Sequence, residues 1–248
     1  MRTITVDSRY AGCGPLILVN REHPLSDFAR GADLAPLSPL HPDILMDRGA
    51  AALLGECLKS VRAGGEIVPV SGWRSRSRQQ AIWDETIAAS GGEFTRRYVA
   101  RPGCSEHETG LAIDLGKRAD KIDFIRPELP YDGVFGAFRR AAARFGFIER
   151  YRQGCEDRTG IAAEPWHFRY VGVPHAQLIE ENGLCLEEYA GFLDGGARTC
   201  RLENGRPVTV MRVPCRGGST EIELPDGCCQ VSGDNAGGFI VTAWGSTL

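Results

Sequence analysis

Two short motifs carry the most reactive side chains of this sequence and limit what the chain can fold into. The first, S-E-H-E-T-G-L-A-I-D, runs from Ser105 to Asp114, and the second, E-P-W-H, runs from Glu164 to His167. Zinc bound by two histidines and one carboxylate, with water in the fourth position, is an established catalytic arrangement. His107, Asp114 and His167 are the natural ligands, which leaves Glu164 to accept a proton from the water. The motifs therefore predict a zinc peptidase.

The spacing inside each motif predicts how the chain passes through the site. His107 and Asp114 are seven residues apart, and an odd separation puts two side chains on opposite faces of a flat strand. Gly110 between them indicates a turn, after which L-A-I-D-L is expected to be a buried strand. The proline in E-P-W-H favours a turn that carries Glu164, followed by a strand H-F-R-Y-V that starts at His167.

Composition and charge exclude several classes of protein. The 248 residues are 42% hydrophobic and 25% charged, which is ordinary for a soluble domain. A net charge of -3 gives no electrostatic reason to expect binding to nucleic acid or to an anionic membrane. No stretch approaches the ~18 apolar residues of a spanning helix. The first ten residues lack the apolar run of a signal peptide, so we expect a cytoplasmic protein.

The sequence contains nine cysteines but no C-x-x-C pair, which argues against a zinc finger or a thioredoxin-type site. In a reducing compartment most of them are expected to be free and buried. Cys104, three residues before His107, is interpreted as a packed neighbour of the site, with a ligand or nucleophile as the alternative. A zinc ribbon is a further alternative for the cysteines near the C-terminus, Cys200, Cys215, Cys228 and Cys229.

Hydrophobic periodicity and the positions of glycine and proline predict the regular elements. Helices are expected at residues 47–63, 76–90, 133–145 and 174–182. Strands are expected at residues 67–70, 111–115, 146–151 and 167–171, with an edge strand at 16–19. The proline-rich segment 22–42 is expected to be an ordered wrap without regular structure, and 91–103 a loop. Three histidines outside the motifs are expected at the surface: His23, His41 and His175.

The composition changes after about residue 194. Short alternating segments follow, separated by clusters of Gly, Asp, Asn and Pro, which is typical of strands and turns. We therefore divide the chain into a catalytic domain at residues 1–195 and a small strand-rich C-terminal module at residues 196–248. The C-terminal module contains no histidine and no recognisable catalytic motif.

Arginines near the motifs allow two interpretations. Arg74 lies in S-G-W-R-S, between an expected strand and an expected helix, where positioned functional side chains are common. It could be an ordinary surface arginine, but a neighbouring metal site favours a functional role. A second group, Arg96, Arg97 and Arg101, could receive an anionic substrate or form a solvated face.

Four motifs occur in an order that resembles a known family: S-G-W-R-S, P-G-C-S-E-H-E-T-G-L-A-I-D, G-F-I-E-R-Y and E-P-W-H-F-R-Y-V-G. Over roughly residues 45–182 the chain is similar to the zinc D-alanyl-D-alanine carboxypeptidases and dipeptidases of the VanY and VanXY type. This resemblance implies a compact α+β fold with a central antiparallel sheet and helices on its outside. It also implies Zn²⁺ held by His107, Asp114 and His167.

The resemblance implies roles for further residues. Glu164 would be the general base and acid, and Arg74 would stabilise the developing oxyanion. The substrate would be a small peptide ending in D-Ala-D-Ala, as in the peptidoglycan precursors that glycopeptide resistance enzymes hydrolyse, and the enzyme a monomer or a homodimer. The positions near the terminal carboxylate of the substrate would be Gln79 or Gln80, Ser105 and Tyr98.

Other functions are compatible with the same residues. The same catalytic set would serve an L,D-carboxypeptidase acting on muramyl tetrapeptides, or an endopeptidase. A module that only binds peptidoglycan peptides is a different class, although such a module needs no base beside an open metal position. The histidines could also be satisfied core residues without a ligand role.

Overall fold

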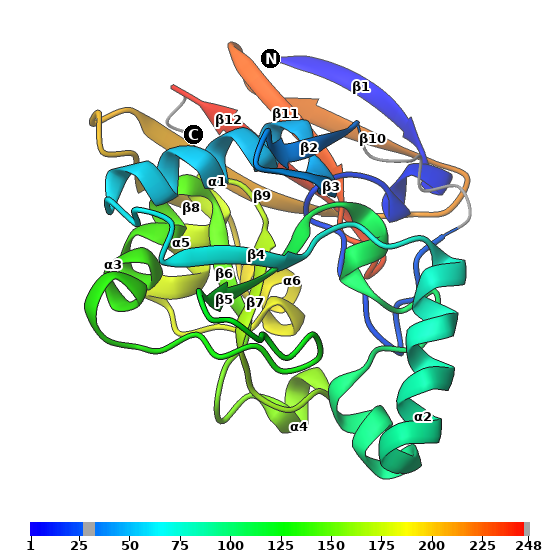
Figure 1. Ribbon diagram of the computed structural model, residues 1–248. Helices are drawn as coiled ribbons and strands as arrows, with labels where there is room; N and C mark the ends of the chain where they lie inside the picture. The colour runs from blue at the N-terminus through cyan, green and yellow to red at the C-terminus, as the bar shows by residue number, and fades with distance from the viewer. Residues whose placement is uncertain (27–32, 246–248) are drawn as a thin grey trace.

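The computed structural model describes residues 1–26 and 33–245, and a four-stranded antiparallel sheet stands at its centre (Figure 1). The strand order is β4-β5-β7-β6, and every neighbouring pair is antiparallel. The mixed helix and strand content agrees with the α+β class. The four strands are β4 (Ile67–Ser71), β5 (Ala112–Lys117), β6 (Phe147–Tyr151) and β7 (Glu164–Tyr170).

Hydrophobic clusters cover both faces of this sheet. Phe147 belongs to the cluster shared with α1 (Arg48–Ser60) and α3 (Gly133–Ala142), whereas its neighbour Ile148 belongs to the cluster shared with α5 (Val173–Glu181) and α6 (Leu186–Asp194). Successive side chains of a strand point to opposite faces, so the two clusters lie on opposite sides of the sheet. The two middle strands, β5 and β7, therefore lie between two hydrophobic layers, which keep the side chains at the strand ends in place.

The helices begin where the sequence offers capping side chains. Asp47 accepts a hydrogen bond from the backbone of Ala50 at the start of α1, and Ser75 accepts one from Arg78 at the start of α2 (Arg76–Tyr98). Gly91 has a φ of 80° and interrupts α2, but the helix resumes after it. The loop predicted from residue 91 is therefore wrong up to Tyr98.

The strand-rich pattern after residue 194 is confirmed. A second four-stranded antiparallel sheet has the order β11-β12-β9-β8, and β10 pairs instead with the N-terminal strand β1 (Arg2–Asp7) (Figure 1). Residues 2–7 therefore lie with the strands that follow residue 195. The division into residues 1–195 and 196–248 stays a prediction. The C-terminal strands are β8 (Arg198–Arg201), β9 (Pro207–Pro214), β10 (Ser219–Leu224), β11 (Cys228–Gly233) and β12 (Gly238–Trp244).

Residues 16–19 are buried, but they do not form the predicted edge strand. The backbone N–H of Leu16 donates to Ser232 Oγ at 3.1 Å, and that of Leu18 donates to the Asp234 carbonyl at 2.9 Å. The apolar run is thus used for burial against the C-terminal strands, without a regular ladder of hydrogen bonds.

The proline-rich segment 22–42 also differs from its prediction, apart from residues 27–32, which lie outside the described part. β2 (Leu34–Ser38) and β3 (His41–Asp47) form a separate two-stranded antiparallel sheet. Each strand of such a sheet has one open edge, where Pro36 or Pro42 can sit without removing a ladder hydrogen bond. The prolines therefore did not exclude strands here.

His175 is not at the surface, and that prediction is wrong. It lies on α5 with only 2% of its surface exposed. Its Nδ1 is 2.8 Å from the Tyr189 hydroxyl and its Nε2 is 2.9 Å from Thr242 Oγ1, so both ring nitrogens are satisfied. His23 and His41 are partly exposed.

The remaining short helices are η1 (Ser8–Gly12), η2 (Glu106–Thr109), η3 (Ala143–Phe145) and α4 (Glu156–Thr159).

Helices in the described parts of the chain, residues 1–26 and 33–245, are all too short or too polar to cross a membrane.

Candidate metal centre and active site

Asp114 on β5 and His167 on β7 are direct partners in the central sheet. Asp114 Oδ1 lies 3.0 Å from His167 Nδ1, and both side chains are buried. Paired residues on neighbouring strands bring their side chains to the same face. Two of the three predicted ligands are thus brought together by the strand register.

His107 reaches the same place from the short helix η2. Gly110 ends η2 with a φ of 75°, a left-handed conformation that glycine adopts at little cost, and the chain then enters β5. His107 Nε2 is 3.2 Å from Asp114 Oδ2, while its Nδ1 is 2.7 Å from the Gly72 carbonyl. A proton on Nδ1, donated to that carbonyl, leaves Nε2 free to bind a metal.

Glu164 starts β7, opposite Tyr151, so the predicted turn at this position is wrong. The pairing is irregular here. Glu149 of β6 pairs with Phe168, whereas Tyr151, two residues later on β6, pairs with Glu164, four residues earlier on β7. Bulges of this kind redirect side chains beside active sites. As a result Glu164 and His167, three residues apart, lie close together, with Glu164 Oε2 3.7 Å from His167 Nδ1.

The three predicted ligands have the composition and spacing of a metal site. Their candidate ligand atoms all lie within 4.8 Å of one another, and all three residues are buried. Two imidazoles and one carboxylate, with carbonyl and carboxylate groups behind the rings, suit zinc. The described residues contain no other group of this kind. The alternative of a zinc ribbon among the C-terminal cysteines therefore finds no support.

No disulfide links any of the nine cysteines, as expected, but the expectation that most are buried is wrong. Cys57, Cys155 and Cys185 are buried, whereas the others are partly or fully exposed. Cys104 is partly exposed and does not belong to the cluster of candidate ligands.

Burial and neighbouring charges set the protonation states of the three candidate ligands. Burial and the charge of Arg74 lower the pKa of His107 to about 4, which keeps this imidazole neutral. Burial would raise the pKa of Asp114, but His107 and His167 hold it well below its usual range. His167 differs: burial opposes its charge, yet the neighbouring carboxylates of Asp114 and Glu106 raise its pKa to about 9. A metal bound at this position must displace that proton.

Glu164 is buried, and burial raises its pKa to about 8, with the charges of His167 and Arg74 opposing the rise. Carboxyl groups with a raised pKa are suited to pass protons near neutral pH. A divalent cation beside it would favour the ionised form. It lies beside the group of candidate ligands without belonging to it.

Arg74 lies at the same cavity, between β4 and α2. Its backbone N–H donates to the His107 carbonyl at 3.2 Å, and its Nη2 is 4.0 Å from Asp114 Oδ2. The side chain is 14% exposed, so the ordinary surface interpretation does not hold. The loop between β4 and α2 therefore places a nearly buried guanidinium beside the candidate metal ligands.

Of the residues that the family resemblance places near the substrate, Gln79, Ser105 and Tyr98 line the same cavity, whereas Gln80 does not. Gln79 is buried and donates from its side chain to the Ala100 carbonyl at 2.7 Å, whereas Gln80 is exposed and donates to Asp84. The geometry thus favours Gln79. Ser105 is buried beside His107, and Tyr98 contributes from the end of α2.

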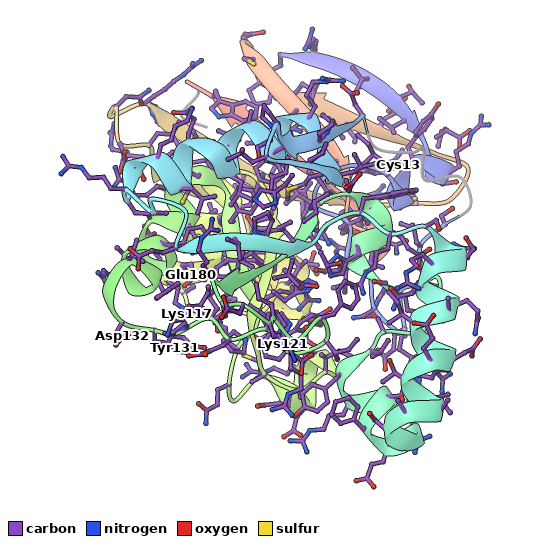
Figure 2. All side chains as sticks on the ribbon, viewed as in Figure 1. Cys13, Lys117, Lys121, Tyr131, Asp132 and Glu180 are labelled. Carbon is purple, nitrogen blue, oxygen red and sulfur yellow. The ribbon has the colours of Figure 1, made fainter. Side chains whose placement is uncertain are left out.

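Other cavity residues were missed by the sequence reasoning. The connection 117–132 is rich in charged residues, and the labelled residues Lys121, Tyr131 and Asp132 mark its exposed course in Figure 2. Two adjacent apolar residues of this connection, Phe124 and Ile125, nevertheless line the cavity. An apolar pair within a charged run was the available signal. Further lining residues, among them Tyr151, Ile161 and Trp166, had been assigned no role.

Comparisons with known proteins agree with this geometry. The family model of VanY, described as D-alanyl-D-alanine carboxypeptidase, matches residues 43–173. The bifunctional D-Ala-D-Ala dipeptidase and carboxypeptidase VanXYC of Enterococcus gallinarum is 36% identical over 180 residues, which is 72% of this chain and 94% of the relative. A D-alanyl-D-alanine carboxypeptidase of Enterococcus faecium is 30% identical over 99% of this chain and 80% of its own length.

Solved structures also match this chain. The vancomycin resistance D,D-dipeptidase VanXYg, crystallised with a D-Ala-D-Ala phosphinate analogue, is 44% identical with a TM-score of 0.94 and covers 98% of both chains. A variant of the D,D-pentapeptidase VanY, crystallised with Zn(II), is 34% identical with a TM-score of 0.60 over 71% of this chain and 98% of its own. The chain therefore belongs to the VanY family of D-alanyl-D-alanine carboxypeptidases, and over nearly its full length it is similar to a VanXY enzyme.

Proposed function

We propose that this protein is a zinc-dependent D,D-peptidase that removes the terminal D-alanine from the dipeptide D-Ala-D-Ala and from longer peptides with the same ending. One observation carries the proposal. The candidate ligand atoms of His107, Asp114 and His167 lie within 4.8 Å of one another, with the Glu164 carboxylate beside them and an arginine facing them. The similarity to VanXYC and VanXYg supports activity on both kinds of substrate.

Each protein group has one task in the proposed reaction. His107, Asp114 and His167 would hold zinc, which when bound polarises a carbonyl and lowers the pKa of water to ~7. Glu164 accepts the proton of the attacking water and passes it to the amine of the departing D-alanine, so one carboxylate acts as base and then as acid. Arg74 donates to the oxygen of the scissile carbonyl as negative charge develops there.

Substrate orientation is proposed to come from other residues of the cavity. Ser105 and Gln79 would hold the terminal carboxylate, since both are buried and line the cavity, and a hydrogen bond to the Ala100 carbonyl fixes the side chain of Gln79. Tyr98 would also contribute, and guanidinium groups lie 5.6 Å (Arg97) and 5.0 Å (Arg126) from the centre of its ring. Positive charge at this rim favours an anionic peptide terminus.

An L,D-carboxypeptidase is the second candidate, supported by the likeness to the LD-carboxypeptidase LdcB. That structure is 34% identical, with a TM-score of 0.57, and covers 69% of this chain. The same ligand and base chemistry serves both activities, so only the substrate distinguishes them. The match to VanXYg over nearly the whole chain favours the D,D-activity.

Release of D-alanine from matched peptides tests the choice. The zinc-loaded protein is given D-Ala-D-Ala, an acylated peptide ending in D-Ala-D-Ala, and its counterpart ending in L-Lys-D-Ala. We expect release from the first two, with kcat/KM at least ~100-fold above that for the third, because a misplaced substituent at the reacting centre disturbs alignment strongly. Preferred cleavage of the third peptide would contradict the D,D-assignment.

A further inference from the structure

A buried carboxylate lies behind the second histidine of the candidate metal site. Glu106, the residue before His107, has a side chain with no exposed surface. Its Oε2 is 3.5 Å from His167 Nε2, on the side of the ring away from Asp114. Although it lines the cavity, Glu106 does not belong to the group of candidate ligands.

Two arginines hold this carboxylate in its charged form. Arg150 Nε donates to Glu106 Oε1 at 2.8 Å, and Arg169 Nη1 lies 2.9 Å from the same oxygen. Burial alone would raise the pKa of Glu106, but the two guanidinium groups hold it well below its usual range. Both arginine side chains have no exposed surface either.

The second carboxylate oxygen of Glu106, Oε2, faces the outer ring nitrogen of His167. Glu106 Oε2 and His167 Nε2 are both buried, and neither makes a hydrogen bond of regular length within residues 1–26 and 33–245. They face each other at 3.5 Å. With Oε1 shared by two arginines, Oε2 is the acceptor nearest to the outer nitrogen of the ring. A metal ligand histidine needs such an acceptor, because a proton kept on the outer nitrogen leaves the inner one free to bind.

We infer that Glu106 is a positioning residue that sets the tautomer and the orientation of His167, so that Nδ1 points toward Asp114 and the metal. This inference rests on the proposed zinc site. Glu106 touches neither substrate nor metal in this role and acts only through the histidine ring. His107 has the Gly72 carbonyl as its outer acceptor, so each histidine of the site has its own acceptor.

The carboxylate also connects the metal site to segments outside residues 43–173, the part matched by the family model. Arg150 donates to both oxygens of Glu187 on α6, at 2.8 and 2.6 Å. Arg169 donates through Nη2 to the carbonyls of Pro15 and Ile17, at 3.0 and 2.9 Å. The N-terminal segment thus binds Arg169 and α6 binds Arg150, and these two arginines position Glu106.

A purely structural role for the ion pairs is the competing explanation, and Glu187 provides the matched control. Glu106→Gln and Glu187→Gln each remove one carboxylate from buried Arg150, so both should lower the stability of the metal-free protein. Only Glu106 faces His167. Zinc affinity, measured by competition with a chelating dye at a temperature where both variants are folded, separates the two explanations.

We expect Glu106→Gln to weaken zinc binding by about 10- to 100-fold, the usual effect of losing an outer partner of a metal ligand. Glu187→Gln should change it by less than about threefold. Equal losses in both variants, or wild-type affinity in Glu106→Gln, would overturn the inference. Absence of zinc binding in the wild-type protein would instead contradict the proposed function itself.

A second pair of variants keeps the test valid if Glu106→Gln does not fold, because that change leaves two buried guanidinium groups with one carboxylate. Arg169→Gln retains the Glu106 carboxylate, whereas Glu106→Gln combined with Arg169→Gln removes both charges and keeps the Arg150–Glu187 pair. The double variant should bind zinc about tenfold or more weakly than Arg169→Gln. Equal affinities would show that the carboxylate does not act on His167.

Discussion

Asp114 and His167 face each other across neighbouring antiparallel strands, with Asp114 Oδ1 3.0 Å from His167 Nδ1. The register of β5 against β7 therefore fixes the distance between two candidate ligands before any metal arrives. A slip of one residue would turn one of the two side chains to the opposite face. The hydrophobic layers on both faces of the sheet oppose such a slip.

Replacing Glu164 with Gln should separate metal binding from catalysis. The variant keeps the three candidate ligands, so we expect about one zinc per chain, while kcat falls by about 10²- to 10⁴-fold because the proton acceptor is lost. His107→Ala is the opposite control, which should lose both zinc and activity. Metal analysis and D-alanine release on both proteins give the result. A Glu164→Gln protein that lacks zinc, or that stays active, would refute the assignment.

Arg74→Lys should lower kcat by about 10²- to 10³-fold, the usual range for losing one oxyanion donor. Lysine keeps the charge but not the planar group with several donors. Arg78→Lys is the matched control, since Arg78 lies on the exposed side of α2, 3.3 Å from Glu85. Steady-state kinetics with a peptide ending in D-Ala-D-Ala provide the readout. Unchanged kcat in Arg74→Lys would exclude its role in the transition state.

His175 should make the fold sensitive to acid. Burial lowers its pKa to about 3, whereas the unfolded chain has a value of ~6.5. Below pH ~6.5 the unfolded state takes up a proton that the folded state does not, so the free energy of unfolding falls by ~1.4 kcal/mol per pH unit. The contribution is complete above pH ~6.5, and about 2 kcal/mol of it is lost at pH 5.

Urea unfolding of the metal-free protein at pH 7.5 and pH 5 tests this prediction. The wild-type protein should lose ~2 kcal/mol more than His175→Gln between the two values, since the variant has no group to titrate at this position. Comparing the two proteins cancels the contributions of the other histidines. The same loss in both proteins would mean that His175 does not remain neutral in the fold.

Much of the candidate site could be predicted because ligand types and spacing are local properties. His107, Asp114 and His167 were assigned from their chemistry, and the structure brings them together. The strands around them follow from runs of apolar residues and were found with small errors at the ends. Gln79 could not be separated from Gln80 by sequence alone, because that choice depends on which face of α2 meets the cavity.

The errors come from contacts between distant parts of the chain. His175 has its partner Thr242 67 residues later, and no local pattern shows that it is buried. Glu164 was expected on a turn, because the irregular pairing with β6 that accommodates the proline cannot be read from the sequence. Glu106 was passed over for the same reason, since both of its arginines lie more than 40 residues away along the chain.

The most direct test measures zinc content and D-alanine release on the same purified protein, before and after chelation. We expect about one zinc per chain and release of D-alanine from both D-Ala-D-Ala and a pentapeptide ending in D-Ala-D-Ala. Removal of zinc should abolish release and lower the melting temperature, since the ion binds only the folded chain, and added zinc should restore both. A protein that binds no zinc, or that releases D-alanine equally well without it, would contradict the central claim.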